Sequence, residues 1–382
     1  MTEIKMYEKK DGTTAYMFSV YLGMDELTGK VKTTTRRGFQ TQKEARLAMS
    51  KLLLDTDKHG FQKLDNKPFK AIYEQWYDQY KSTVKESTYT KTDEHFTLHI
   101  LPEIGSIPMN KLKTIHIQTA VNKWFKAGLT RYKRFYNYIN RVLIWAYKMQ
   151  IINDNPASRV ILPVNTSQFK TMKDNYYDLK ELKHFFECLN DLDNPQAYMY
   201  FRLLAFTGMR KGESLALLWT DIDFNNNQIS ITKTESQGAH GRLLVNTPKT
   251  DASVRVVNVD NKTMSMLKDW RKTQRNELLM LGFNTINKDQ LVFSNNRNTM
   301  LVPTKPRIWL QRVVQRFDLK NVTVHAFRRT FATLAIESGA TLKEVQAQLG
   351  HSSYKTTADV YTEVTKKQRK DTAQKYANYV NF

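Results

Sequence analysis

Residues 325–361 read HAFRRTFATLAIESGATLKEVQAQLGHSSYKTTADVY, which combines two histidines, adjacent arginines and two tyrosines with helix-like apolar spacing. The middle of this stretch resembles a helix-turn-helix with Gly339 at the turn, as in a transcription regulator. That interpretation explains the helices but assigns no purpose to His325 and Arg328 upstream or to Tyr361 downstream. The rest of the chain must therefore distinguish a DNA-binding regulator from an enzyme.

Charge points to a polyanionic partner. The 382 residues contain 59 Lys and Arg against 37 Asp and Glu, which gives a net charge of +22 and a sequence pI near 9.7. The excess is +3 for residues 1–66, +8 for residues 67–165 and +11 beyond, so it is not confined to a tail. Nucleic acid is the leading candidate, because neutralising phosphates and releasing their counterions drives such binding.

The composition also indicates where the protein works. No apolar run approaches the roughly 20 residues of a membrane-spanning helix, and the N-terminal MTEIKMYEKK has no signal-like apolar core. Cys188 is the single cysteine, so neither an internal disulfide nor a cysteine-based zinc site can form. We expect a soluble intracellular protein in a reducing cytoplasm, not associated with a membrane.

The N-terminal segment predicts a small sheet that carries one helix. Residues 13–39 alternate like two strands, AYMFSVYLG and KVKTTTRRGF, joined by the turn-forming DELTGK. Thr41 is a candidate N-cap for a helix through TQKEARLAMSKLLLD, with Glu44 at the capping-box position. The polar residues 57–67 follow as a predicted linker.

From Pro68 to about Val164 the pattern is helical, and it predicts helices in PFKAIYEQWYDQYK, ESTYTKTDEHFTLHIL, TIHIQTAVNKWFKAG and TRYKRFYNYINRVLIWAYKMQ. The last of these, residues 130–150, is the most informative. Its apolar residues recur at helical spacing, and its basic residues fall on another face. The apolar stripe comprises Phe135, Ile139, Val142 and Ala146. The other face comprises Arg131, Arg134, Tyr138, Arg141 and Lys148. This face is either a phosphate-gripping surface or an ordinary solvated basic face, since charge on a helix exterior is common.

Asn155-Pro156 ends the helical region, and PVNTSQFKTMKDNYYD reads as a second linker. A mixed region follows. We expect helices in PQAYMYFRLLAFTG, in NKTMSMLKDWRKTQRNELLML and in the opening stretch, and strands in QISITKTES and VRVVNV. The fold class is therefore multidomain, mainly α with α+β parts.

Breaking a phosphodiester without a metal requires a nucleophile, donors for the non-bridging oxygens and an acid for the leaving 5′ oxygen. The sequence supplies each of these groups. The candidates are Arg210, Lys249, His325, Arg328, His351 and Tyr361. The chain has no GxxxxGK[ST] loop and no carboxylate cluster suited to two-metal chemistry, so we expect neither a cofactor nor a metal.

Five sequence boxes, in order over about 150 residues, resemble those of the tyrosine recombinases, in particular the integrases of temperate phages and integrative conjugative elements (conjugative transposons). The boxes are TGMRKGESLAL, TPKTDASVR, HAFRRT, LGHSS and ADVYTEVT. Residues 66–164 are similar to the helical, SAM-like core-binding domain through KESTY, HILPEIG and IINDNPA. Residues 1–60 are more loosely similar to the arm-binding domain, a three-stranded sheet packed on a helix. Residues 172–382 would form the mixed α/β catalytic domain with its C-terminal tail.

The resemblance implies a role for each candidate. Arg210 and Arg328 would hold the scissile phosphate, because a planar guanidinium bonds two oxygens at once and keeps its charge. Tyr361 would attack phosphorus to give a 3′-phosphotyrosine, and Lys249 would protonate the departing 5′-hydroxyl. Both histidines, His325 and His351, would bond the phosphate and assist proton transfer. Glu213 would support the site without reacting.

Two of these positions have competitors. Lys233 lies on the strand that precedes Lys249. Tyr354 lies three residues after His351, which is too close for the family, whereas Tyr361 lies ten residues after it.

The resemblance also implies partners, a product and a location, which is the nucleoid in the cytoplasm of a bacterial host. The partners are double-stranded DNA attachment sites of core and arm type, a homotetramer on DNA, an accessory excisionase and a host DNA-bending protein. The expected reaction is site-specific integration and excision of a mobile element through a Holliday junction, without metal or ATP. The alternatives are a type IB topoisomerase-like nicking-closing enzyme and a non-catalytic sequence-specific regulator.

Overall fold

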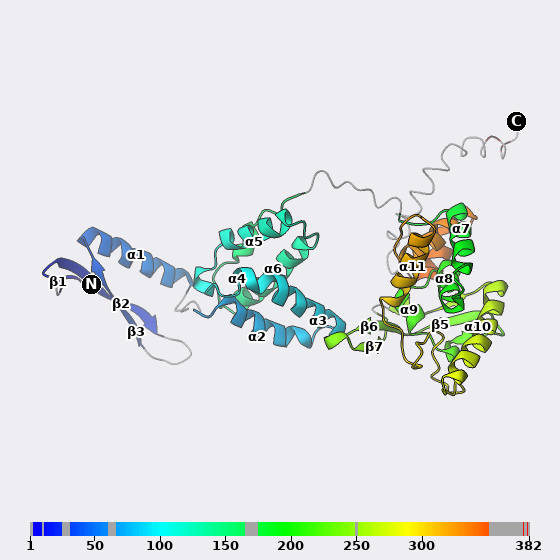
Figure 1. Ribbon diagram of the computed structural model, residues 1–382. Coiled ribbons are helices and arrows are strands. Elements are labelled where there is room, and N and C mark those ends of the chain that lie inside the picture. Colours follow the sequence, from blue (N-terminus) through cyan, green and yellow to red (C-terminus); the bar gives the residue numbers. More distant parts are fainter. Residues whose placement is uncertain are drawn as a thin grey trace. The chain divides into compact units, whose positions relative to one another are not determined.

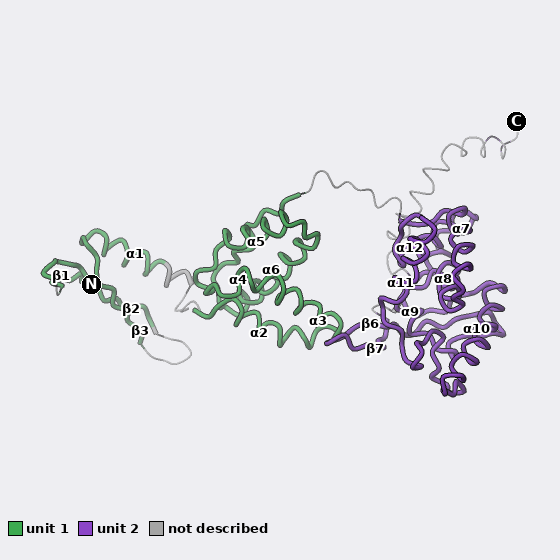
Figure 2. The backbone as a smooth tube through the Cα atoms, viewed as in Figure 1, with its two compact units in different colours: residues 1–165 green, residues 166–382 purple. Residues whose placement is uncertain are grey.

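The computed structural model describes residues 3–9, 11–24, 31–59, 66–164, 175–248 and 251–350, together with residues 377 and 380. The chain divides into two compact units, residues 1–165 and residues 166–382 (Figure 2). Separate hydrophobic cores form in the N-terminal sheet, in the helical segment that follows it and in the second unit. The expected multidomain fold, mainly helical with small sheets, is confirmed (Figure 1).

The first unit begins with an antiparallel sheet in the order β1 (Ile4–Glu8), β2 (Thr14–Met24) and β3 (Val31–Phe39), followed by α1 (Gln42–His59). Its small core contains Phe18, Val20 and Ala45. A register shift opposite Tyr16 and Met17 leaves Gly38 of β3 as an extra residue, because Tyr16 pairs with Phe39 and Met17 with Arg37. A bulge of this kind changes which side chains of the bulged strand face inward. The predicted N-cap is present, because the Glu44 backbone N–H donates to Thr41 Oγ1 at 3.2 Å.

The helical segment follows the predicted order. Its helices are α2 (Phe69–Lys81), α3 (Glu86–His95), α4 (Leu101–Ile104), α5 (Thr114–Lys126) and α6 (Tyr132–Lys148), with short helical turns η2 (Met109–Lys111) and η3 (Pro156–Arg159). All four members of the predicted apolar stripe on α6 are buried in the core of this segment.

One predicted helix is interrupted. The pattern over residues 86–101 predicts a continuous helix, but a five-residue π-helical turn, η1 (Phe96–Ile100), separates α3 from α4. Pro102 lies in the first turn of α4 and has no N–H to donate to the carbonyl of Leu98. The regular hydrogen-bond ladder cannot continue at this point, which fits a wider turn.

The predicted second linker is shorter than its composition indicates. Tyr177 is 1% exposed and belongs to the core of the second unit. Its N–H donates to Thr330 Oγ1 at 2.9 Å, and its hydroxyl donates to the Lys320 carbonyl at 2.9 Å. The last residues of this stretch therefore begin the second unit.

The second unit packs helices around small sheets. Its helices are α7 (Leu179–Asn190), α8 (Pro195–Thr207), α9 (Lys211–Leu215), α10 (Asn261–Met280), α11 (Lys305–Arg316), α12 (Ala326–Glu337) and α13 (Leu342–Leu349). One antiparallel sheet has the order β4 (Ile222–Asp223), β5 (Gln228–Ile231) and β8 (Arg255–Asn258). A separate hairpin pairs β6 (Thr234–Gln237) with β7 (Leu243–Asn246). Short turns η5 (Trp219–Asp221), η6 (Ala239–Gly241) and η7 (Asp251–Ser253) complete it.

Two features of this unit differ from the sequence-based expectation. The single predicted strand over residues 228–236 divides between β5 and β6, which belong to different sheets. The helices α7, α9 and α11 were not expected. The paired helices of the opening stretch are present as α12 and α13, which share a small core, with Gly339 at a φ of 100° between them.

Candidate active site

Arg328 lies on the first turn of α12 and is only 4% exposed. Its guanidinium donates through Nη1 to the Gly208 carbonyl at 2.7 Å and through Nη2 to the Leu349 carbonyl at 2.6 Å. Burial, followed by the positive charge of Arg210, lowers the pKa of Arg328 to about 9. The side chain remains a cation at neutral pH, and a phosphate beside it would relieve the cost of burying that charge.

Gly208 makes this arrangement possible at the end of α8. It caps that helix in the left-handed conformation, with a φ of +66°. A Cβ at this position would lie 2.4 Å from Leu349 Cδ2 and 2.7 Å from Phe331 Cδ1. The absence of a side chain therefore lets α8, α12 and α13 meet where Arg328 donates its bonds.

Arg210 is the N-cap residue of α9, and Glu213 in the first turn of that helix accepts hydrogen bonds from both its backbone and its side chain. The backbone N–H of Arg210 donates to Glu213 Oε2 at 2.9 Å, and its Nη1 donates to Glu213 Oε1 at 2.7 Å. Its Nη2 donates to the Gly350 carbonyl at 3.3 Å. The Arg210 side chain is 36% exposed, whereas that of Glu213 is 2% exposed. A buried carboxylate therefore fixes the position of the Arg210 guanidinium, and the exposed part of this group can bind an incoming anion.

The state of Glu213 depends on its arginine neighbours. Burial alone would raise its pKa, but hydrogen bonds and charge from Arg255, with further bonds from Arg210, outweigh burial and lower the pKa below its ordinary value. Glu213 is thus a carboxylate at neutral pH.

Arg255, on β8, was not among the sequence candidates. It donates through Nη2 to Glu213 Oε2 at 3.0 Å and through Nη1 to Glu213 Oε1 at 3.3 Å. Its Nε donates to the Gln348 carbonyl at 2.8 Å. The pattern VRVVNV could not reveal this role, because valines occupy both faces of the strand and alternation alone does not decide which face is inside.

His325 precedes α12 and has an exposed side chain. Desolvation by the surrounding protein, with the positive charges of Arg328 and Arg210, lowers its pKa below the ordinary histidine value. These influences favour a neutral ring at neutral pH, which offers one donor and one acceptor nitrogen.

The structure therefore brings Arg210, Glu213, His325 and Arg328 together. Lys249, His351 and Tyr361 lie outside the described residues, as does Tyr354. Lys233 is described, and its Nζ lies 2.8 Å from Asp221 Oδ1, with 24% of its side chain exposed. The ammonium of this competing lysine is thus already engaged by a carboxylate.

The basic residues predicted to contact DNA lie on α6 and at its N-terminal end. Arg131, Arg134, Arg141 and Lys148 are all exposed. At about 100° per residue they fall within an arc of roughly 100° that lies directly beside the buried stripe. The side chain of His95 has its pKa lowered first by burial and then by Arg131 and Arg134, which shows that positive charge gathers near the start of α6.

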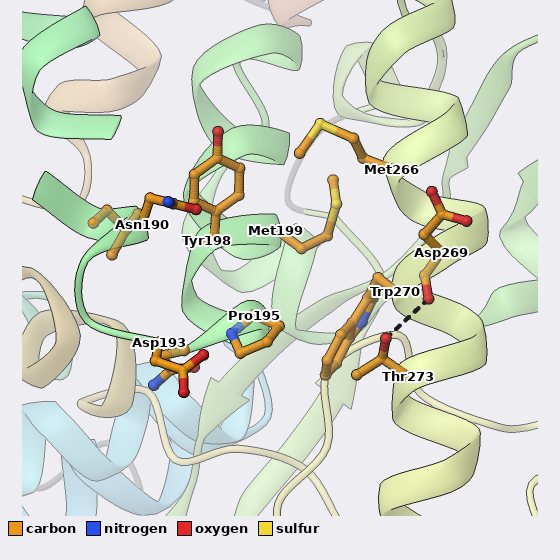
Figure 3. Close-up of a pocket in the computed structure, with 11 residues that line it drawn as sticks. Asn190, Asp193, Pro195, Tyr198, Met199, Met266, Asp269, Trp270 and Thr273 are labelled. Carbon is orange, nitrogen blue, oxygen red and sulfur yellow. Dashed lines mark hydrogen bonds between the residues drawn. The ribbon is translucent and has the colours of Figure 1, made fainter. Parts of the chain in front are cut away.

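Other features of the described chain add no second reaction centre. No group of three or more metal-binding side chains occurs among the residues described. Within the same residues, no helix is long and apolar enough to cross a bilayer. A pocket of about 380 Å³ lies between the α7–α8 turn and α10, lined by Pro195, Tyr198 and Trp270 among others (Figure 3). The lining residue of α8 nearest the end of that helix is Met199, and roughly 14 Å of helix lies between it and Gly208, whose carbonyl accepts from Arg328.

Comparison with known proteins identifies the family. The model of the phage integrase family matches residues 176–368, that of its N-terminal SAM-like domain matches residues 68–125, and that of an arm DNA-binding domain matches residues 4–56. The chain belongs to the phage integrase family, the tyrosine recombinases. It is an enzyme that breaks and rejoins DNA strands through a tyrosine, and it recombines DNA at specific sites.

Particular relatives extend over almost the whole chain. A tyrosine recombinase XerC-like protein of Caldanaerobacter subterraneus is 27% identical, covering 94% of this chain and 95% of its own length. The ICEBs1 integrase of Bacillus subtilis is 26% identical, covering 97% of this chain and 99% of its own.

Solved structures share the fold. The Tn1549 transposon integrase in complex with transposon right-end DNA has a TM-score of 0.65 at 17% identity, over 80% of this chain and 99% of that one. A lambda integrase tetramer bound to a Holliday junction has a TM-score of 0.57 at 14% identity, over 93% of this chain and 94% of that one.

Proposed function

We propose that this recombinase is the integrase of a mobile element and that Arg210, Arg328, His325, Lys249, His351 and Tyr361 perform its strand cleavage. The observation that carries the proposal is the convergence of Arg210 and Arg328 on adjacent carbonyls, those of Gly350 and Leu349. His351 follows Gly350 directly in the sequence, and Tyr361 follows ten residues later.

The arginines would bind the two non-bridging oxygens of the scissile phosphate. Among the charges of the described residues that act on Arg328, only that of Glu213 is negative, so this cluster retains positive charge for a phosphate. That charge would stabilise the extra negative charge of the pentavalent transition state more than the ground state, which is the condition for lowering the barrier. A neutral His325 would donate a hydrogen bond to the phosphate and would add no further positive charge to the site.

In the chemical step, the Tyr361 hydroxyl would pass its proton to one of the two histidines, His325 or His351, and its oxygen would form a bond to phosphorus while the bond from phosphorus to the 5′ oxygen breaks. Lys249 would supply the proton that converts the departing oxygen to a hydroxyl, and His351 would bond the phosphate and assist proton transfer. The engagement of Lys233 by Asp221 favours Lys249 over Lys233 for this role. The 3′-phosphotyrosine conserves the energy of the broken bond, so attack by a partner strand's 5′-hydroxyl needs no further energy source.

The other parts of the chain would bring the DNA to this site. We assign residues 1–60 to arm-type sites, residues 66–164 to core-type sites through the α6 face, and residues 172–382 to catalysis. Four protomers would act on two attachment sites, and the reaction would pass through a Holliday junction. This assignment is made by analogy with the lambda integrase, which was solved as a tetramer bound to a Holliday junction. An excisionase and a host DNA-bending protein would decide between integration and excision. The reaction would take place at the nucleoid of a bacterial host.

The test begins with a core site recovered by binding selection from random duplexes. A nicked suicide substrate carrying that site is incubated in EDTA with the wild type, Tyr361→Phe and Tyr354→Phe, and run on a denaturing gel. The proposal requires a covalent band from the wild type and Tyr354→Phe and none from Tyr361→Phe. A band that survives in Tyr361→Phe on DNA that this variant binds would move the nucleophile elsewhere.

A further inference from the structure

Arg255 is a buried arginine at the centre of the site to which the mechanism above assigns no step. Its side chain is 7% exposed, and it faces the Glu213 side chain, which is 2% exposed. Both carboxylate oxygens of Glu213 accept from Arg255, at 3.0 and 3.3 Å, in the two-pronged geometry that only a guanidinium provides.

Its place on β8 is unusual for a charged residue. Along the strand and its flanks, Val254 and Val256 are 52% and 54% exposed, whereas Val257 and Val259 are buried. Arg255 therefore shares the inward face of the strand with Val257 and Val259, and valines occupy the outward face. Burying an arginine where an apolar side chain would fit costs free energy, so a specific interaction must compensate for it.

That interaction connects two halves of the site. Arg255 Nε donates to the Gln348 carbonyl at the end of α13, and Arg255 Nη1 and Nη2 donate to Glu213 on α9. Gly350 leaves room for it, because a Cβ there would lie 2.8 Å from Arg255 Cδ. The same Glu213 carboxylate holds the Arg210 guanidinium at 2.7 Å.

We propose that Arg255 is a positioning residue for the cleavage step, which fixes Glu213 between α9 and α13 so that the Arg210 guanidinium stays in place to receive the scissile phosphate. The proposal rests on the phosphate-binding role of Arg210 given above. Arg255 itself does not reach the DNA, because its donors are directed to Glu213 and to the Gln348 and Ser253 carbonyls.

This role predicts a specific pattern of defects. Arg255→Gln removes both bonds to Glu213 and leaves the carboxylate with Arg210 alone, so Arg210 is drawn toward Glu213 and loses its fixed position. We expect cleavage of the suicide substrate under single-turnover conditions to slow about 10- to 100-fold, the range for losing a group that orients a ligand-holding residue. DNA affinity should change less than about threefold, because contacts across the whole duplex supply it. The cleavage rate of Arg255→Lys should lie between those of the wild type and Arg255→Gln. A single ammonium group cannot reproduce the fixed geometry in which the guanidinium bonds both Glu213 oxygens and the Gln348 carbonyl.

A double-mutant cycle separates positioning from general destabilisation. If Arg255 acts through Glu213, then Arg255→Gln combined with Glu213→Gln should cleave no more slowly than the slower single variant. If the rate losses of the two single variants multiplied in the double variant, the proposal would be overturned. The double variant has no unpaired buried carboxylate, so its cleavage rate can be measured even if Arg255→Gln alone does not fold.

Control variants distinguish this inference from the proposed role of Arg210 on which it rests. Arg275→Gln, on the exposed face of α10, should cleave as the wild type does. Arg210→Lys should lose at least about 100-fold; if it does not, the assignment of Arg210 is wrong. If Arg210→Lys fails to cleave but folded Arg255→Gln cleaves at the wild-type rate, the inference about Arg255 alone is wrong. A fall in DNA affinity that accounts for the whole defect of Arg255→Gln would also overturn it.

Discussion

Replacing Gly208 with alanine would place a methyl group in space that Leu349 and Phe331 already occupy. The backbone at Gly208 has a φ of +66°, and an L-residue pays about 1–2 kcal/mol for such a conformation. The new Cβ would also lie 2.4 Å from Leu349 Cδ2 and 2.7 Å from Phe331 Cδ1. Leu349 cannot retreat freely, because it is fully buried in the small core that α12 and α13 share, and forcing an extra carbon into such packing costs about 1–3 kcal/mol more.

The two costs add to about 2–5 kcal/mol of unfolding free energy. In a unit of this size, one kcal/mol lowers Tm by about 2–4 °C, so a cost near 3 kcal/mol corresponds to roughly 6–12 °C. The measurement is thermal unfolding followed by circular dichroism, with urea unfolding as a second determination of the free energy.

Gly282→Ala is the matched control for this prediction. Gly282 lies in the same unit with a φ of +82°, and nothing lies within 4 Å of the Cβ that alanine would add. It should therefore show the backbone cost alone, about 1–2 kcal/mol. Equal destabilisation of the two variants would refute the claim that close packing of α8, α12 and α13 makes glycine necessary at position 208.

Three further predictions concern other parts of the molecule. Glu235 is 7% exposed, both its carboxylate oxygens are buried without a hydrogen-bond partner among the described residues, and burial raises its pKa to about 7. Because the folded state holds the proton more tightly, stability should fall as the pH rises from about 4.5 to about 7. Glu235→Gln should remove that dependence and stabilise the protein at pH 8 by about 1–3 kcal/mol, and urea unfolding at pH 5 and pH 8 that shows no such change would contradict the assignment. Arg134→Ala and Arg141→Ala should each weaken binding to core-site DNA and lower the slope of log affinity against log salt by about 0.9, as measured by fluorescence anisotropy; an unchanged slope would mean that these side chains only face solvent. Phe135→Ala should cost about 3–5 kcal/mol of unfolding free energy, since Phe135 is 2% exposed, whereas Leu98→Ala, at 67% exposed, should change unfolding little.

The parts that sequence alone predicted are those in which local pattern and tertiary environment agree. The apolar stripe of α6 repeats over several turns, and all four residues named for it are buried. The boxes around Arg210 and Arg328 were recognisable because residue type and order carry the signal. The expected three-stranded sheet with its helix, and the membership of the recombinase family, are confirmed in the same way.

The parts that sequence missed depend on contacts between distant residues. Residues 228–236 keep a strand-like pattern throughout, but β8 pairs with the first part and β7 with the second, and no local signal marks the change. Arg255 was missed because its partners, Glu213 and Gln348, are 42 and 93 residues away. The π-helical turn at Phe96–Ile100 lies inside a stretch whose periodicity is otherwise helical, so periodicity could not locate it.

Three consecutive carbonyls at the end of α13 accept from three different arginines, Gln348 from Arg255, Leu349 from Arg328 and Gly350 from Arg210. The main chain of α13, and not its side chains, therefore spaces these cations. Its exposed residues Lys343 and Ala347 can therefore change without disturbing the guanidinium groups. A lineage could alter these two positions while inheriting the reaction unchanged.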